Sequence, residues 1–216
     1  MERFHIPASS RYPFALLLTF GAWWLLLGVS PWYRQDWLLE NVLVVIAIPL
    51  LVWAHGRLRV SNAAYTCLFV FLCLHEIGAH FTYSEVPLPE WLGNLLNLQT
   101  SGLPRNHFDR LVHFLYGLLI APLAVELLDA RAPQRGPLWR FLIPWLFVVS
   151  HATLFEIVEA SAAVLFGGDL GEAYLGTQGD SWDSQKDSAL AAIGAVIGVA
   201  LHRRFAGNRS PTDQAS

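Results

Sequence analysis

The chain has 216 residues, of which 54% are hydrophobic and 14% are charged. Because a typical soluble domain carries about 25% charged residues, this composition argues against a soluble globular protein and favours helices packed in a membrane. The formal net charge of -3, without a basic patch, argues against nucleic acid as a partner. Cys67 and Cys73 lie inside one apolar run, which is typical of buried reduced thiols.

Apolar segments predict an all-α polytopic membrane protein, a bundle of six transmembrane helices in one domain over residues 1–205. In chain order, the spans are expected at about residues 13–29, 37–54, 63–81, 108–128, 138–166 and 185–202. These lengths match or exceed the roughly 17–25 residues that cross a bilayer. The first segment is similar to a signal peptide, but Trp32 and Tyr33 follow it as an interfacial anchor in place of a small-residue cleavage site.

The connections between the expected spans are polar. The connection over residues 83–107 contains Leu88–Leu98, which would lie flat as an interfacial helix. Residues 167–179 form a loop rich in glycine, which leads into the last span. Residues 206–216 are polar and are expected to form a disordered tail.

The distribution of Lys and Arg predicts the orientation of the chain. With the N-terminus inside, most of the 14 Lys and Arg residues fall on the cytoplasmic side, so both termini are expected to be cytoplasmic. The third and fifth spans then end near the outer leaflet, where the fourth and sixth spans begin. Most histidines gather at this level, together with the following carboxylates: Glu76, Asp109, Glu156, Glu159, Asp180, Asp183 and Asp187. Such a one-sided cluster of costly intramembrane groups indicates a functional site.

Asp109 and His113 are spaced i, i+4 at the start of the fourth span, so both side chains face one direction. They could be two ligands of one cation, or a carboxylate that orients a histidine. The alternative is an interhelical hydrogen-bonding pair that holds the bundle together.

Glu76 and His80 share one face of the third span and would serve as metal ligands or as a proton relay, with helix-to-helix hydrogen bonding as the alternative. The stretch that begins at His75 is similar to the H-E-x-x-H motif of zinc proteases. Its second histidine stands at i+5, which places the two histidines about 140° apart and excludes that motif.

Glu156 and Glu159 stand one turn apart on the fifth span. Two carboxylates at this separation can share a proton, bind a cation or pair with an arginine. Arg105 and Arg110 lie near the same level, so an ion pair is the alternative reading. His151 is about two turns from Glu159, and the two glutamates are preferred as site residues.

Asp180, Asp183 and Asp187 fall on one face at the beginning of the sixth span. The first two could cap the helix, but capping does not explain Asp187 inside the span. With Asp109 and the two glutamates nearby, a divalent cation would offset the repulsion. Oxygen ligands suit Mg²⁺, Mn²⁺ or Ca²⁺, and added ligands from His80 and His113 would shift the preference toward Zn²⁺ or Mn²⁺.

Several of these motifs, in this order, resemble the YjdF-like family of bacterial inner-membrane proteins, a domain of unknown function. The resemblance covers roughly residues 60–200 and rests on three stretches: His75–Tyr83, Arg105–Phe114 and Leu175–Asp183. It implies the fold and a multi-pass location in the bacterial inner membrane, but no reaction.

A more distant resemblance connects the chain with the VanZ-like family. It rests on three pieces: Asp109 with His113 and Phe114, the helix with Glu156 and Glu159, and the aspartate stretch leading to Gly194 and Gly198. The chain lacks the Asn that this family has near Asp187, and it has Gln178 or Gly179 where the family has an Arg. A shared substrate is therefore not inferred.

Three functions follow from the cluster. The first is a metal-assisted membrane hydrolase or transferase acting on a lipid or lipid-linked phosphate at the outer leaflet. In it, Glu76, Asp109, His113, Glu156 and Glu159 act in catalysis, and the aspartates, His80 and His113 bind the metal. The second is a cation- or proton-coupled transporter or metal-binding membrane protein, and the third is a non-catalytic envelope factor.

Overall fold

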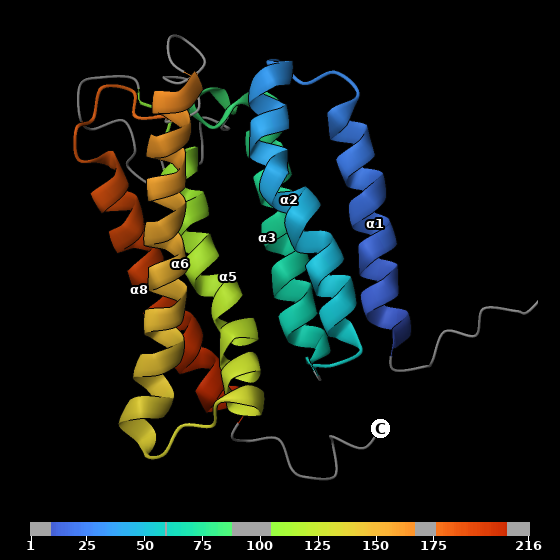
Figure 1. Ribbon diagram of the computed structural model, residues 1–216, viewed down its shortest axis with the longest axis vertical. Coiled ribbons are helices and arrows are strands. Elements are labelled where there is room, and N and C mark those ends of the chain that lie inside the picture. The colour runs from blue at the N-terminus through green and yellow to red at the C-terminus, as the bar shows by residue number, and fades with distance from the viewer. Residues whose placement is uncertain (1–9, 59, 88–104, 167–175, 207–216) are drawn as a thin grey trace, which may run out of the picture.

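The computed structural model describes residues 10–58, 60–87, 105–166 and 176–206, and it is helical throughout (Figure 1). The elements are α1 (Arg11–Gly28), α2 (Arg34–His55), α3 (Asn62–Phe81), the short 3₁₀ helix η2 (Tyr83–Glu85), α5 (Phe108–Arg131), α6 (Pro137–Phe166) and α8 (Asp183–Ala206). No strand occurs in these ranges, and the all-α prediction is confirmed. The expected interfacial helix at 88–98 and nearly all of the expected tail lie outside the described residues.

Five helices, α2, α3, α5, α6 and α8, are long and apolar enough to cross a membrane. Helix α1 has 18 residues and begins with Arg11, Tyr12 and Pro13, which shorten its apolar stretch below the roughly 20 residues of a typical span. Large apolar side chains on α2, such as Leu50 and Trp53, are exposed, as expected of a surface that faces lipid. The chain is a multi-pass membrane protein with five candidate spans in its described part.

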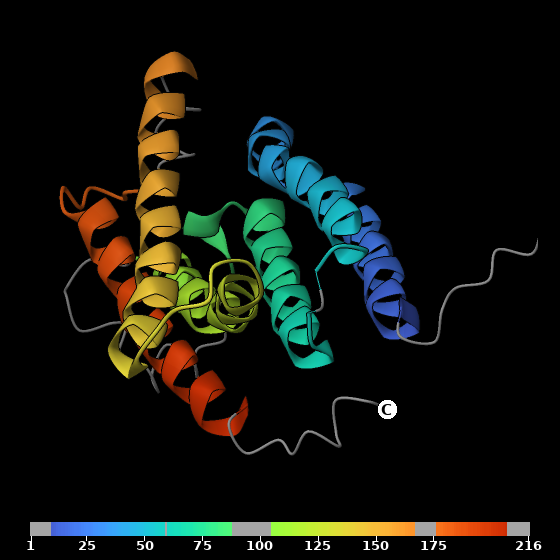
Figure 2. The same ribbon diagram turned by 60° about the horizontal axis from the view of Figure 1, so that its bottom comes forward.

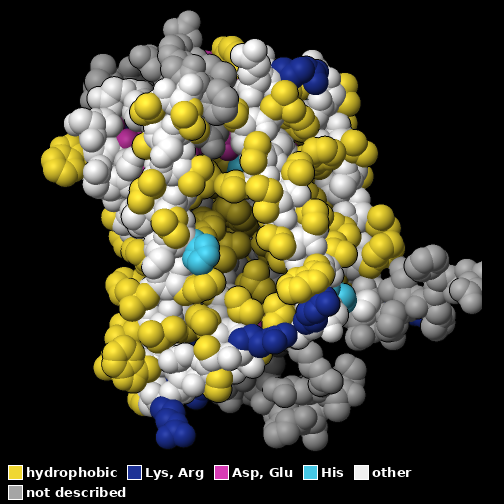
Figure 3. Space-filling view, in the orientation of Figure 1, with side chains coloured by type: hydrophobic (Ala, Val, Ile, Leu, Met, Phe, Trp, Pro, Cys, Tyr) yellow, Lys and Arg dark blue, Asp and Glu magenta, His cyan; other side chains and the backbone are white. Residues whose placement is uncertain are grey.

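The helices form two groups, α1 with α2 and α3, and α5 with α6 and α8 (Figures 1 and 2). The main contacts between the groups join α3 and η2 to α5. Between them, one face has a hollow whose walls are hydrophobic, with a few acidic and histidine side chains above it (Figure 3). The Lys and Arg side chains on this face lie mainly at the lower end of the molecule.

Helices α5 and α8 are packed backbone to backbone through glycines. A Cβ atom on Gly117 of α5 would overlap the carbonyl oxygen of Ala191, and one on Gly194 of α8 would overlap the carbonyl oxygen of Phe114. Gly198 meets α5 in the same way one turn further on. Small residues allow this close approach between transmembrane helices. The packing fixes the start of α8 beside the start of α5.

At the end of the bundle opposite the starts of α5 and α8, polar contacts connect the two helix groups. The Glu126 carboxylate of α5 accepts hydrogen bonds from the backbone N–H and the hydroxyl of Ser61, both at 2.6 Å. Ser61 is also the N-cap of α3, because its Oγ accepts from the Ala64 N–H at 3.2 Å. Arg203 of α8 pairs with Asp129 of α5 at the same end. These contacts hold the lower end together and are remote from the residues predicted as a site.

Candidate functional site

The predicted site residues of three helices meet at one end of the bundle. Asp109 lies in the first turn of α5, Asp183 is the first residue of α8, and Glu156 and Glu159 lie near the end of α6. Because α6 runs antiparallel to both α5 and α8, its last turns reach the level at which the other two begin (Figure 1). Helix direction thus brings together side chains that are far apart in the sequence.

The first group consists of Asp109, Asp183 and Asp187, each of which offers a carboxylate oxygen within 4.8 Å of the others. Asp187 is 1% exposed and Asp183 is 4% exposed. One oxygen of Asp187, Oδ1, has no hydrogen-bond partner among the described residues. A buried carboxylate oxygen without a partner is costly, so this atom is a candidate ligand for a cation.

The second group consists of His113, Glu156 and Glu159, whose ligand atoms also lie within 4.8 Å of one another. The Nε2 atom of His113 is 3.4 Å from Asp109 Oδ1 and 3.4 Å from Glu156 Oε1, so the imidazole connects the two groups. The approach to Glu156 lacks hydrogen-bond geometry, and Oε1 has no hydrogen-bond partner in the described part of the chain. The two groups therefore form one continuous polar site.

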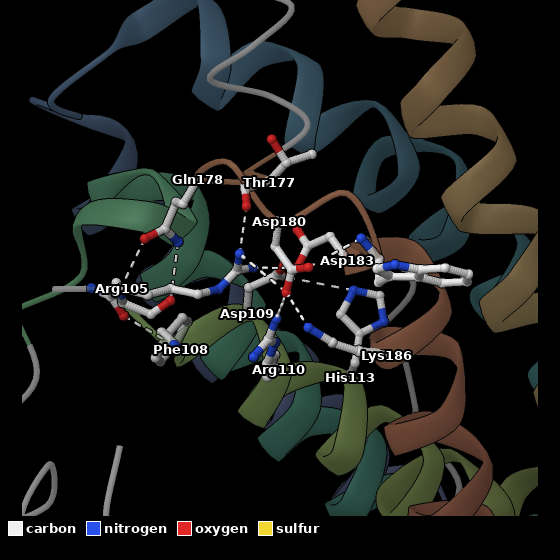
Figure 4. A network of polar contacts seen from close by, with 12 residues as sticks. Arg105, Phe108, Asp109, Arg110, His113, Thr177, Gln178, Asp180, Asp183 and Lys186 are labelled. Atoms are coloured by element: carbon white, nitrogen blue, oxygen red, sulfur yellow. Dashed lines mark hydrogen bonds and ion pairs between the residues drawn. The ribbon is translucent and has the colours of Figure 1, made fainter. Parts of the chain in front are cut away.

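Two arginines, Arg105 just before α5 and Arg110 in its first turn, neutralise part of this charge (Figure 4). Arg105 pairs with Asp183 and also donates to the carbonyl oxygen of Thr177. Arg110 pairs with Asp180 and lies 3.4 Å from Asp183 Oδ1. The sequence suggested these arginines as partners of the glutamates of α6. In the structure they form ion pairs with Asp180 and Asp183 at the start of α8.

Asp180 differs from the other aspartates because its partners are charged. Its carboxylate accepts from the Lys186 ammonium at 2.5 Å, and its Oδ1 accepts from the Trp182 N–H at 3.0 Å, which closes the turn before α8. Lys186, then the Trp182 N–H and Arg110, hold the pKa of Asp180 well below its ordinary value. Asp180 thus acts as an ion-pair and turn residue beside the ligand groups, where the sequence had suggested a metal ligand.

Two hydrogen bonds between the Asn106 backbone and the Gln178 side chain fix the segments around the site, and the sequence did not predict them. The Asn106 N–H donates to Gln178 Oε1 at 2.9 Å, and Gln178 Nε2 donates back to the Asn106 carbonyl at 3.0 Å (Figure 4). The Asn106 side chain also accepts from the Phe108 N–H at 2.9 Å, which satisfies a free donor at the start of α5. These bonds join the segment before α5 to the segment before α8.

A neighbouring polar group lies between α2 and α3. It contains Glu76, which the sequence singled out, and also Asp36 and Glu40, which it did not. The available signal was the i, i+4 spacing of Asp36 and Glu40, which places both on the buried face of α2. Tyr83 contacts both sides, because its hydroxyl meets His75 of α3 and its ring packs against Phe108 of α5. Burial, followed by the Glu40 and Asp109 carboxylates, raises the pKa of Tyr83 well above the ordinary value.

Two histidines lie away from the site. The Nδ1 atom of His80 donates to the carbonyl oxygen of Leu27 in α1 at 2.7 Å, and the ring packs against Phe81. His80 is therefore not placed with the ligand groups, although the sequence suggested it as a metal ligand. His151 is exposed and donates to the Phe147 carbonyl within its own helix at 2.8 Å.

The site offers five carboxyl groups and one imidazole in two groups of three. Carboxylate oxygens are the ligands that Mg²⁺, Mn²⁺ and Ca²⁺ prefer, and one imidazole is compatible with Mn²⁺ or Zn²⁺. Such a donor set could hold one cation, or two cations that share the Asp109–His113 region. The arrangement is also compatible with binding protons, because closely spaced carboxylates repel one another and protonation removes that repulsion.

A family model described as "Predicted membrane protein (DUF2238)" matches residues 12–208. The "Inner membrane protein YjdF" of Escherichia coli (strain K12) is 32% identical over 182 residues, which cover 82% of each chain. No solved structure matches. These matches confirm the YjdF-like resemblance and the multi-pass location in the bacterial inner membrane, within the lipid bilayer, whereas they give no support to the VanZ-like one.

Proposed function

The chain belongs to the DUF2238 family of membrane proteins, and from this premise we propose that it binds a divalent cation at the junction of α5, α6 and α8. The cation would assist an enzyme reaction on a lipid or lipid-linked phosphate. The observation that carries the proposal is the convergence of Asp109, Asp183 and Asp187 around an oxygen of Asp187 that lacks a partner within the described ranges.

The charge balance of the site supports a cation. Arg105 and Arg110 account for Asp180 and part of Asp183. No ion pair within 4.0 Å joins Asp187 or Glu159 to a described Lys or Arg. Ionised carboxylates so close to one another repel, and a divalent cation removes that repulsion.

The residues divide into two roles under this proposal. The three aspartates would be the oxygen ligands, with His113 as a ligand or as the group that orients Asp109. Glu156 and Glu159 would receive or hold a proton next to the reacting group. A bound cation supplies charge stabilisation for a phosphoryl oxygen or activates water.

The proposed orientation places the site at the outer leaflet and both termini in the cytoplasm. Arg57 follows the end of α2, and Arg131 and Arg203 lie at the ends of α5 and α8, opposite the site, where the positive-inside rule favours the cytoplasm. On the face shown in Figure 3, the Lys and Arg side chains lie mainly at that end. This topology requires α1 to cross as a sixth span. Contacts at both of its ends support a crossing: Ser10 Oγ is 3.0 Å from His55 Nε2, and the Trp32 N–H donates to the His80 carbonyl at 2.9 Å.

Metal analysis of the purified protein tests the proposal. We expect bound Mg²⁺, Mn²⁺ or Zn²⁺ in the wild type and a loss of at least about tenfold in affinity for Asp187→Asn and for Asp109→Asn, as is typical when a metal site is disturbed. Asp180→Asn is the matched control, since Asp180 is paired with Lys186 and is not in either ligand group. Equal metal content in all three variants and the wild type would refute the cation site.

Lipid turnover then separates the enzyme from its alternatives. Wild-type protein in nanodiscs should hydrolyse or transfer a labelled lipid-linked phosphate, and Asp187→Asn should not. A cation- or proton-coupled transporter is the second candidate, favoured by the hollow between the helix groups with acidic side chains above it (Figure 3). In that case, proteoliposomes would show cation flux without lipid turnover. A non-catalytic envelope factor would show neither.

A further inference from the structure

The α2–α3 group contains three carboxyl groups that the proposed cation site does not use. Asp36, Glu40 and Glu76 are 2%, 4% and 0% exposed. All three stand on helices that are candidate membrane spans. Fully buried carboxyl groups in a membrane are expensive unless they are paired, protonated or bound to an ion.

No described Lys or Arg pairs with these carboxyl groups. The Thr82 hydroxyl donates to Asp36 Oδ2, whereas Asp36 Oδ1 has no hydrogen-bond partner among the described side chains. No ion pair within 4.0 Å connects Asp36, Glu40 or Glu76 to a Lys or Arg in the ranges that the structure covers. Three ionised carboxylates would therefore be left without a compensating charge.

Glu76 is the most isolated of the three. Asn41 and Trp37 of α2 lie beside its carboxyl group, but neither carboxyl oxygen makes a hydrogen bond of normal geometry in the described structure. The Asn41 amide is engaged elsewhere, because its Nδ2 donates to the Trp37 carbonyl at 2.8 Å and its Oδ1 accepts from the indole of Trp24. The surroundings of Glu76 thus provide neither a cation nor an aligned donor.

His75, the neighbour of Glu76, does not supply the missing charge. Its Nε2 lies 3.3 Å from the Glu40 carbonyl oxygen, which can only accept, so Nε2 carries a proton. Its Nδ1 lies 2.5 Å from the Tyr83 hydroxyl, which donates to it when the ring is neutral. Neither ring nitrogen contacts a carboxylate of the described residues.

A metal ion fits this group less well than a proton. The two clusters of three possible ligands found in the described residues both lie among α5, α6 and α8, and Asp36, Glu40 and Glu76 do not form a third. A proton needs no set of converging ligands, and a protonated carboxyl group loses the charge that makes burial expensive.

We propose that Glu76 is a proton-binding site, a carboxyl group that holds a proton at neutral pH in the folded protein. The titratable groups whose charges interact with that of Glu76 are Glu40 of α2, Cys73 of α3 and Tyr83 of η2. Asp36 interacts with Glu40, and His75 is the chain neighbour of Glu76. The ligand is a proton, and the site is distinct from the cation site. Tyr83 connects the two regions, since its hydroxyl contacts His75 of α3 and its ring packs against Phe108 of α5.

Infrared spectroscopy of the protein in nanodiscs tests this proposal. The wild type at pH 7 should show the carbonyl stretching band of a protonated carboxylic acid, shifted in D₂O. Glu76→Gln should remove one component of that band, and Glu76→Asp should keep a band at a shifted position. Glu126→Gln is the matched control, because the Glu126 carboxyl group accepts two hydrogen bonds from Ser61 at the opposite end of the bundle, away from the α2–α3 group.

Two results would overturn the proposal. One is an acid band that is unchanged in both Glu76 variants. The other is a loss of bound divalent metal in Glu76→Gln comparable to that in Asp187→Asn, which would make Glu76 a metal ligand. If Glu76→Gln does not fold, the position of the band in Glu76→Asp decides the question. Because the readout is an acid band, failure of the cation proposal leaves this test intact.

Discussion

The two helix groups hold their buried carboxyl groups in different ways. At the junction of α5, α6 and α8, carboxylates converge in two groups whose ligand atoms lie within 4.8 Å of one another, and arginines pair with Asp180 and Asp183. In α2 and α3, no described Lys or Arg pairs with Asp36, Glu40 or Glu76, and neither Glu76 oxygen has a hydrogen-bond partner among the described residues. Convergence creates a negative field that favours a cation, whereas isolation favours a proton.

The packing of the two groups follows the same division. Helices α5 and α8 touch through glycines along one face, so the aspartates of α8 cannot move away from Asp109 without shifting a whole helix. Helix α2 has much less extensive contact with α3, and its outer face is exposed. A rigid frame suits ligands that must hold a fixed geometry, while a single protonated carboxyl group does not need one.

The largest expected effect on stability comes from disrupting the close packing of α5 against α8. Gly194→Val places a branched side chain where a Cβ would already overlap the Phe114 carbonyl oxygen. Ordinary overpacking lowers the free energy of unfolding by up to about 3 kcal/mol. We expect a larger loss here, and little folded protein, because the backbone rather than a side chain must move. Gly21→Val in α1 is the control, since a Cβ there meets nothing within 4 Å. Size-exclusion profiles and thermal unfolding would compare the two, and equal behaviour would refute the close packing.

The next effect concerns the charge balance at the start of α8. Arg105→Gln removes the buried partner of Asp183, whose side chain is only 5% exposed, and we expect a loss of about 3 kcal/mol. Added Mg²⁺ or Mn²⁺ should recover part of the melting temperature, because a cation replaces the lost charge. Lys186→Gln, at a half-exposed side chain, should cost about 0–1 kcal/mol. Equal melting temperatures for the two variants would show that the buried Arg105–Asp183 pair stabilises the fold no more than the half-exposed pair of Lys186.

A smaller effect is expected at the connection between the two groups. A Cβ on Gly78 would lie 2.6 Å from the Tyr83 ring, so Gly78→Ala should displace the ring and break its contact with His75. We expect a loss of about 1–3 kcal/mol, as for other overpacking changes. Tyr83→Phe keeps the ring and should lose only the hydrogen bond, about 1 kcal/mol. Thermal unfolding measures both, and a larger loss for Tyr83→Phe would mean that Gly78 does not position the ring.

The sequence was sufficient to predict that polar residues of α5, α6 and α8 meet at one level, for a physical reason. Helical spacing placed Asp109 with His113, and the distribution of Lys and Arg placed three helix ends at one level. The same reasoning could not find the arginine pairs, because the partner of Arg105 depends on the path of the loop before α8. Gly194 was noted in the sequence, but a small residue does not identify the helix that it meets.

The rotation of each helix about its axis explains why the sequence did not predict the polar contacts of α2 and α3. Asp36 and Glu40 stand at the start of a long apolar run, and only contacts with α3 decide that they point inward. His80 shares a helix face with Glu76 by spacing, yet it reaches the Leu27 carbonyl at the end of the helix. Periodicity identifies a shared face, but the end of a helix can present that face to a different neighbour.

The smallest expected effect is a pH dependence at Asp180. Lys186, the Trp182 N–H and Arg110 lower its pKa in the folded protein, so the folded state holds the proton less tightly than the unfolded state, whose value is about 3.9. Its contribution to stability is therefore present above pH about 3.9 and is lost as the pH falls through the lower folded value. Thermal unfolding of the wild type and Asp180→Asn should differ by a constant amount at neutral pH, and the difference should shrink in acid. A difference that instead grows in acid would show that the ion pairs with Lys186 and Arg110 do not stabilise the charged form.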